Sequence, residues 1–197
     1  MMVPTTAQQE TMTPEEIGAN KGQAYAMFGA WISKHHPSTA YSLVKSFINS
    51  LREEKHHPSV GVVGLCWGGW AAVFLTHEGE DTGVDAAVSI HPGGLTVPDD
   101  FVQVAKPLLF QVGDLDDLIP ATEIPKVEEV LKGKEGCEVK VYKGQVHGFA
   151  ARGDYSVEKE RKAKELCAQN VLFTNSLLIV DSRVLGQVYE IVGCDRI

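Results

Sequence analysis

The sequence predicts an α/β protein whose mostly parallel sheet is covered by helices on both faces. Short apolar runs rich in β-branched residues are typical of buried strands, and helical stretches lie between several of them. Four such runs occur, at residues 59–65, 83–90, 106–113 and 137–142. Because parallel strands need a crossover between them, this alternation favours a single sheet with helices on each side.

Composition favours one folded domain. The 197 residues are 44% hydrophobic and 22% charged, which is ordinary for a globular protein with a substantial core. The net charge of −8 repels a polyphosphate backbone, so nucleic acid is not an expected partner. No apolar stretch approaches the roughly 20 residues of a membrane span, and residues 1–18 lack a signal-peptide pattern. We therefore expect no membrane association and a cytoplasmic location.

The N-terminal elements are predicted from periodicity and capping. Residues 1–19 show no sustained period and are expected to form a flexible lead-in. A helix is expected over residues 24–34. A second helix follows Pro37 with Ser38 as its N-cap. Its apolar positions indicate one buried face, formed by Leu43, Val44, Phe47, Ile48 and Leu51.

The remaining elements complete the alternating pattern. A glycine turn after the first strand leads into a helix, and two more helices follow later in the chain. These three helices are expected over residues 70–78, 123–131 and 155–176. Residues 20–176 are therefore expected to form the domain. Residues 177–197 are typical of two short strands about a turn, and they form a C-terminal extension to which no role is assigned.

The pentapeptide KHHPS occurs twice, at Lys34–Ser38 and at Lys55–Ser59. Four histidines raise the question of a metal site. Adjacent histidines point in different directions on a helix, and both pairs precede a proline at an element boundary. Because a zinc site needs ligands that converge on the ion and are themselves held in place by hydrogen bonds, we interpret both copies as loop structure and expect no metal.

The first predicted strand ends in Gly64-Leu65-Cys66-Trp67-Gly68. This G-x-C-x-G pattern fits a nucleophile elbow with sulfur in place of oxygen, since flanking glycines permit the tight strand-to-helix turn. The amide of Trp67 and the following helix N-terminus would favour a thiolate and a developing oxyanion. A small hydrophobic role in the turn is the alternative, because a free cysteine is more often buried and inert. The four cysteines are widely spaced without a C-x-x-C pair, so free thiols are expected: Cys66, Cys137, Cys167 and Cys194.

Two further predicted strands are followed by residues that could take part in catalysis. The third strand is followed by GDLDDLIP, which offers three acids, and the fourth by GQVHGFAARGD, which places His147 in a glycine-flanked loop. A calcium loop is disfavoured, because Leu118 and Ile119 stand where oxygen ligands would be needed. Solvated acids before a helix are the alternative to an orienting carboxylate. Nucleophile, acid and histidine follow one another in the chain order of the α/β-hydrolase triad.

Together, GVVGLCWGG, GDLDDLIP and VHGFAARGD resemble the dienelactone hydrolase family, thiol members of the α/β-hydrolase superfamily. The resemblance covers roughly residues 24–178 and implies an α/β-hydrolase-like fold. It implies Cys66 as nucleophile and His147 as base. The family pattern G-x-x-D-x-x-[VI]-P prefers Asp116 over its acidic neighbours. That pattern falls on Gly113, Asp116, Ile119 and Pro120.

The resemblance implies acyl transfer on a small ester or lactone without a metal or organic cofactor. The amide of Trp67 is expected to stabilise the oxyanion. His91, after the second strand, is expected to line the pocket, and Phe149 is also assigned to substrate binding. Arg152, five positions after His147, is the available cation for a substrate carboxylate.

Family members carry more chain before the elbow, which supplies strands, a second oxyanion donor, and a glutamate and an arginine of the site. This sequence is therefore interpreted as N-terminally truncated. The strand at residues 60–65 is expected near an exposed edge, where it should find a partner strand or self-associate, so a homo-oligomer is expected through that edge. The main alternative to a hydrolase is an inactive family member that acts as a binding or interaction module. A thiol redox sensor at Cys66 is a more distant alternative.

Overall fold

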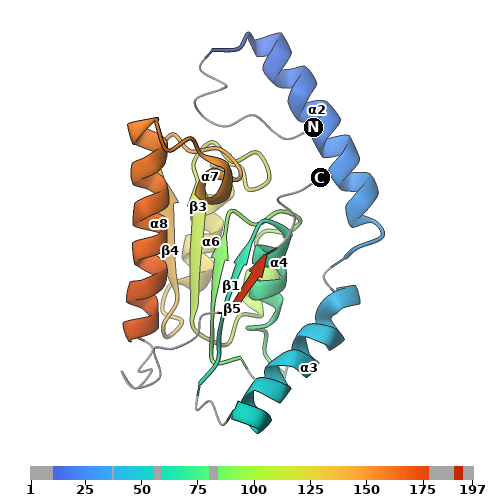
Figure 1. Cartoon of the computed structure of the whole chain (residues 1–197), viewed down its shortest axis with the longest axis vertical. Coiled ribbons are helices and arrows are strands. Elements are labelled where there is room, and N and C mark those ends of the chain that lie inside the picture. Colours follow the sequence, from blue (N-terminus) through green and yellow to red (C-terminus); the bar gives the residue numbers. More distant parts are fainter. Residues whose placement is uncertain (1–10, 37, 56–58, 80–83, 178–188, 193–197) are drawn as a thin grey trace.

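The computed structural model describes residues 11–36, 38–55, 59–79, 84–177 and 189–192. Its centre is a five-stranded sheet in the order β4-β3-β2-β1-β5, and every strand pair is parallel (Figure 1). The strands are β1 (Gly61–Leu65), β2 (Ala86–Ile90), β3 (Leu108–Gly113), β4 (Glu138–Tyr142) and β5 (Tyr189–Val192). The predicted α/β class with a mostly parallel sheet is confirmed.

Helices pack on both faces of the sheet, as predicted. They are α2 (Pro14–Ile32), α3 (Ser38–Lys55), α4 (Trp67–Phe74), α5 (Asp99–Val102), α6 (Ile124–Leu131), α7 (Phe149–Arg152) and α8 (Glu158–Leu177). Side chains alternate across β1, so Val62 joins the core under α4 and α6 while Val63 joins the core under α7 and α8. Within the described residues, no helix is both long and apolar enough to cross a membrane.

The first helix begins earlier than predicted. Helix α2 starts at Pro14, ten residues before the expected start, so part of the expected lead-in is helical. The Thr13 hydroxyl accepts the Glu16 amide N–H while the Glu16 carboxylate accepts the Thr13 amide N–H, and Pro14 occupies the first helical position. This capping box was readable in the sequence TPEE. The apolar period that follows TPEE is weak, so periodicity alone does not predict a helix there.

The second helix is confirmed, but it begins at Ser38, the residue expected to be its N-cap, and its buried face is narrower than predicted. Ile48 and Leu51 are buried, whereas Leu43 and Phe47 are 73% and 51% exposed. Successive helical residues are rotated by about 100°, so the 43/47 row lies to one side of the row that contacts the core. Their expected burial is therefore wrong.

Strand β1 is not an edge strand. It pairs with β2 on one side and with β5 on the other, with Val62 opposite Tyr189 and Leu65 opposite Val192. The expected partner strand for β1 is therefore the chain's own C-terminal segment. The expectation that this strand lies near an edge of the sheet and finds a partner strand is confirmed, and the expected homo-oligomer stays a prediction. The other predicted C-terminal strand falls outside the described residues.

Candidate active site

Cys66 is the single residue between β1 and α4, and its backbone is in an unusual conformation (φ 53°, ψ −114°). A positive φ at a residue other than glycine is strained, and neighbouring hydrogen bonds hold it here. The Cys66 amide donates to the Ile90 carbonyl oxygen at 3.1 Å, and the Gly93 amide donates to the Cys66 carbonyl oxygen at 3.3 Å. The turn after β2 therefore fixes the predicted elbow, with Cys66 half-buried at its tip.

Glycine at position 64 is required by a close backbone approach. A Cβ built there would lie 2.0 Å from the Gly68 carbonyl oxygen. We expect Gly64→Ala to lower the free energy of unfolding by about 1–3 kcal/mol or more, as overpacking does, measured by urea denaturation. Gly22→Ala in α2 is the matched control, because its Cβ meets nothing within 4 Å. Equal midpoints for the two variants would contradict this account of the elbow.

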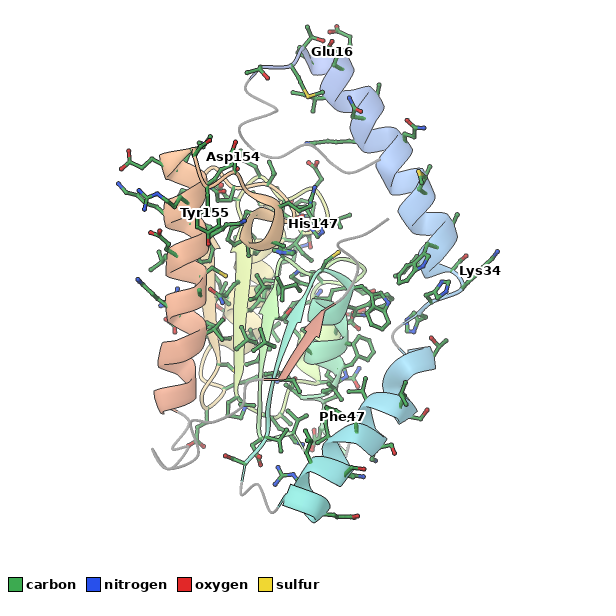
Figure 2. All side chains as sticks on the ribbon, in the orientation of Figure 1. Glu16, Lys34, Phe47, His147, Asp154 and Tyr155 are labelled. Atoms are coloured by element: carbon green, nitrogen blue, oxygen red, sulfur yellow. The ribbon has the colours of Figure 1, made fainter. Side chains whose placement is uncertain are left out.

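The structure brings Cys66, His147 and Asp116 together from the ends of β1, β4 and β3 (Figure 2 marks His147). The Cys66 Sγ lies 3.3 Å from His147 Nε2. His147 Nδ1 lies 3.0 Å and 3.2 Å from the two Asp116 carboxylate oxygens. Each contact is within hydrogen-bond reach, so the three side chains form a continuous chain from sulfur to carboxylate.

The other two acids of this loop bind elsewhere. Asp114 accepts the Gly144 amide N–H at 2.5 Å, which ties the acid loop to the loop that carries His147. Asp117 pairs with Lys21 of α2 at 2.6 Å. The three carboxylates of the loop therefore have separate partners. The Asp114–Gly144 and Asp117–Lys21 contacts could not be predicted from the sequence, because the two residues of each pair lie far apart in the chain.

The electrostatics favour a charged imidazole. Burial lowers the pKa of His147, but the Asp116 charge, its hydrogen bond and the Cys66 contact outweigh this and raise the pKa to about 10. Asp116 is itself 1% exposed, and its Oδ1 accepts the Leu118 amide N–H at 2.9 Å. An imidazolium beside the sulfur stabilises a thiolate, as does the N-terminus of α4, where Cys66 is the N-cap.

The raised pKa of His147 makes stability depend on pH. A group whose pKa is higher in the folded state stabilises fully below its unfolded pKa of about 6.5, and this stabilisation is lost as pH rises toward about 10. We therefore expect the urea midpoint of the wild type to fall between pH 7 and pH 10 more steeply than that of His147→Gln. Parallel slopes in the two proteins would show that the imidazole is not held in its charged form.

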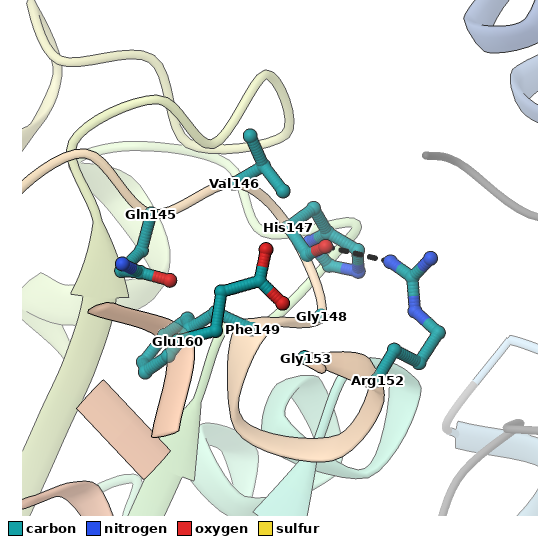
Figure 3. Close-up of a pocket in the computed structure, with 8 residues that line it drawn as sticks. All are labelled: Gln145, Val146, His147, Gly148, Phe149, Arg152, Gly153 and Glu160. Atoms are coloured by element: carbon teal, nitrogen blue, oxygen red, sulfur yellow. Dashed lines mark hydrogen bonds between the residues drawn. The ribbon is translucent and has the colours of Figure 1, made fainter. Parts of the chain in front are cut away.

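Arg152 supports the loop of the base. Its Nη2 donates to the His147 carbonyl oxygen at 2.6 Å, and Figure 3 shows this contact beside a small cavity behind the loop. Gly148 has a φ of 85°, and a Cβ there would lie 2.1 Å from the same Nη2. The guanidinium thus packs directly on the loop backbone. Its expected contact with a substrate carboxylate stays a prediction.

His91 and Phe149 lie behind His147 rather than on an open pocket wall. His91 is 1% exposed and Phe149 is 3% exposed. The His91 ring centroid lies 5.2 Å from that of His147 and 5.7 Å from that of Phe149. Burial, followed by the nearby His147 charge, lowers the pKa of His91 well below its usual value. The two rings therefore form a neutral backing for the base. Phe149 also lines the small cavity behind the loop, and the expected substrate contacts of both residues stay predictions.

Comparison with known proteins extends these observations. The model of the dienelactone hydrolase family matches residues 12–177. A carboxymethylenebutenolidase homolog from Xenopus tropicalis is 28% identical over 137 residues, which is 68% of this chain and 54% of that protein. The hydrolase pyvD from Aspergillus violaceofuscus is 27% identical over 150 residues, covering 75% of this chain and 60% of that protein. The chain spans about half the length of the curated relatives it matches.

Solved structures of other proteins are similar in fold to this chain. A thermophilic esterase from Thermogutta terrifontis, in a butyrate-bound structure, aligns with a TM-score of 0.54 at 18% identity. That alignment covers 72% of this chain and 67% of the esterase. An alpha/beta hydrolase from a Medee basin deep-sea metagenome library aligns with a TM-score of 0.52 at 18% identity, covering 68% and 62% of the two chains. These likenesses show an α/β-hydrolase fold.

Proposed function

Because this chain belongs to the dienelactone hydrolase family, we propose that it hydrolyses small carboxylic esters or lactones with Cys66 as the nucleophile. The family match over residues 12–177 supports ester-bond hydrolysis, as do the hydrolase names of its curated relatives. In this proposal His147 is the general base and Asp116 orients it. The substrate is a small molecule, and no metal or organic cofactor takes part.

One observation carries the proposal: the Cys66 sulfur lies 3.3 Å from His147 Nε2, while Nδ1 of the same ring lies 3.0 Å from Asp116. The alternative, an inert buried cysteine, describes Cys167 of α8 better. Cys167 is 2% exposed, and burial raises its pKa to about 12. Cys66 differs in being half-buried, in a strained elbow and beside an imidazole.

The proposed reaction follows from these positions. The proton of the Cys66 thiol passes to His147, whose raised pKa favours the imidazolium, and the Cys66 sulfur attacks the ester or lactone carbonyl carbon as a thiolate, so that the carbonyl oxygen becomes an oxyanion. The Trp67 amide faces this oxyanion, because the first N–H groups of a helix have no acceptor within the helix. The intermediate collapses to a thioester, and the alkoxide leaves with the proton from His147. A water molecule, deprotonated by His147, then attacks the thioester and releases the acid and the thiol.

The experiment that tests the proposal combines turnover with labelling. The wild type should hydrolyse p-nitrophenyl acetate over many turnovers, and iodoacetamide should remove this activity in parallel with alkylation of Cys66, located by peptide mapping. Cys137 is the internal reference, since burial raises its pKa. Two results together would overturn the proposed hydrolase function: ester cleavage no faster than in buffer alone, and alkylation of Cys66 no faster than that of Cys137. They would favour an inactive family member.

A further inference from the structure

All three tryptophans of the chain lie around the nucleophile elbow. They are Trp31, Trp67 and Trp70. Trp67, which follows the nucleophile, donates its indole N–H to the His35 carbonyl oxygen at 2.6 Å. The ring of Trp31 meets that of Trp67 edge to face, with centroids 6.1 Å apart, and it stacks on His35 at 4.4 Å. An aromatic cluster therefore joins the end of α2 to the elbow.

The first KHHPS copy forms this junction. His35 makes the contacts with Trp31 and Trp67, and the ring of the next residue, His36, lies 4.4 Å from that of Trp70 on α4. The two histidines thus fasten the C-terminal end of α2 to the helix that begins at the nucleophile. The second copy includes His56 and His57, which fall outside the described residues.

Helix α2 is also attached to the acid loop. Lys21 pairs with Asp117, the residue after Asp116, at 2.6 Å. Lys21 and Trp31 are ten residues apart, which is about 15 Å along a helix. The helix therefore reaches from the neighbour of Asp116 to the neighbour of Cys66. Figure 1 shows α2 beyond the carboxyl ends of the strands, where the three triad side chains meet.

We propose that Trp31 and Trp67 form an acyl-binding wall that selects esters or lactones with a planar, apolar acyl group such as an aryl ring. This inference rests on the proposed function and names its substrate class. Both tryptophans are only half-buried, so a flat ring placed against them removes further apolar surface from water. The one lysine of α2, Lys21, is paired with Asp117, so what α2 itself presents beside the elbow is the aromatic ring of Trp31.

The position of Trp67 links recognition to chemistry. Its backbone amide faces the proposed oxyanion, and its side chain belongs to the wall. During the reaction the acyl group is attached to the Cys66 sulfur, one residue away, so it stays beside this wall through both steps. An acyl ring that stacks there is therefore held while the carbonyl carbon is attacked.

Binding can be measured without turnover, because every tryptophan of the chain belongs to the cluster. In the Cys66→Ala protein, methyl benzoate should cause a saturable change in tryptophan fluorescence. Methyl cyclohexanecarboxylate, which is similar in size but not planar, should bind about 3- to 10-fold more weakly, as expected for loss of one aromatic contact. Trp31→Leu in the same background keeps apolar bulk and should remove this preference. Gln23→Ala, at an exposed position of α2, is the control and should retain it.

Kinetics in the otherwise wild-type chain provide the second readout. Trp31→Leu should lower kcat/KM for p-nitrophenyl benzoate, through KM, by about 3- to 10-fold more than it lowers kcat/KM for p-nitrophenyl acetate, without a shift in the pH profile. The proposed acyl-binding wall would be contradicted if the planar and non-planar esters bound equally tightly. It would also be contradicted if Trp31→Leu lowered kcat/KM equally for the benzoate and the acetate. If the wild type cleaves no ester but Cys66→Ala still binds methyl benzoate in a Trp31-dependent way, the proposed function fails and the aromatic site stands.

Discussion

Cys66→Ala is expected to remove the catalysed hydrolysis of p-nitrophenyl acetate, with kcat lower by about 10⁶-fold, the order seen when a protease nucleophile is removed. The reason is that no other described cysteine is placed to attack. Cys167 belongs to α8 and is 2% exposed, and Cys137 directs its thiol to the Lys106 carbonyl oxygen at 3.7 Å. The measurement is initial rate against substrate concentration, with buffer alone subtracted.

Cys137→Ala is the matched control, because it makes the same substitution at a half-buried cysteine outside the triad. It should retain wild-type turnover. Urea denaturation of both variants separates loss of chemistry from loss of fold. Residual activity in a folded Cys66→Ala protein that remains within tenfold of the wild type would assign the chemistry to another group.

The sequence was sufficient for the parts of the site that depend on local patterns. The G-x-C-x-G turn predicted an elbow, and the structure holds Cys66 at a positive φ between β1 and α4. The carboxyl ends of parallel strands lie at one edge of a sheet, so loops after β1, β3 and β4 were expected to meet there. Cys66, Asp116 and His147 do meet, at 3.3 Å and 3.0 Å.

Contacts between distant segments could not be predicted in this way. Nothing in the sequence pairs β5 with β1, because strand order depends on which edges remain open after the rest of the chain has packed. The Lys21–Asp117 pair and the His35–Trp67 bond likewise depend on where α2 lies relative to the sheet. The apolar pattern of a helix predicts its length and its buried face, but not where the helix lies relative to the sheet.

Burial was also misjudged for side chains near the base. His91 follows a strand at the catalytic edge of the sheet, which suggested contact with substrate. In the structure its backbone has a φ of 37°, and its ring is buried against those of His147 and Phe149. Neither of its ring nitrogens has a hydrogen-bond partner among the described residues. A buried polar ring without partners costs free energy, so this enclosure could not be inferred from the polarity of the residue.

Asp116→Asn tests the orienting carboxylate and is expected to lower kcat by about 10⁴-fold, with the fold retained. In the wild type, both carboxylate oxygens lie within 3.2 Å of His147 Nδ1, so that nitrogen carries the proton and Nε2 faces the sulfur. An asparagine amide can donate to Nδ1 instead, which moves the proton to Nε2 and leaves no acceptor for the thiol. Loss of the carboxylate charge also lowers the pKa of His147 toward its usual value.

Alkylation of Cys66 by iodoacetamide separates this effect from changes in ester binding. The rate at pH 7 should fall in Asp116→Asn, because the imidazole beside the sulfur loses its charge. Asp99→Asn, which removes an exposed acid from the first turn of α5, should leave both turnover and alkylation unchanged. If Asp116→Asn retained wild-type alkylation and kcat, the carboxylate at 3.0 Å would only support the loop through the Leu118 amide, and Cys66 and His147 would act as a dyad.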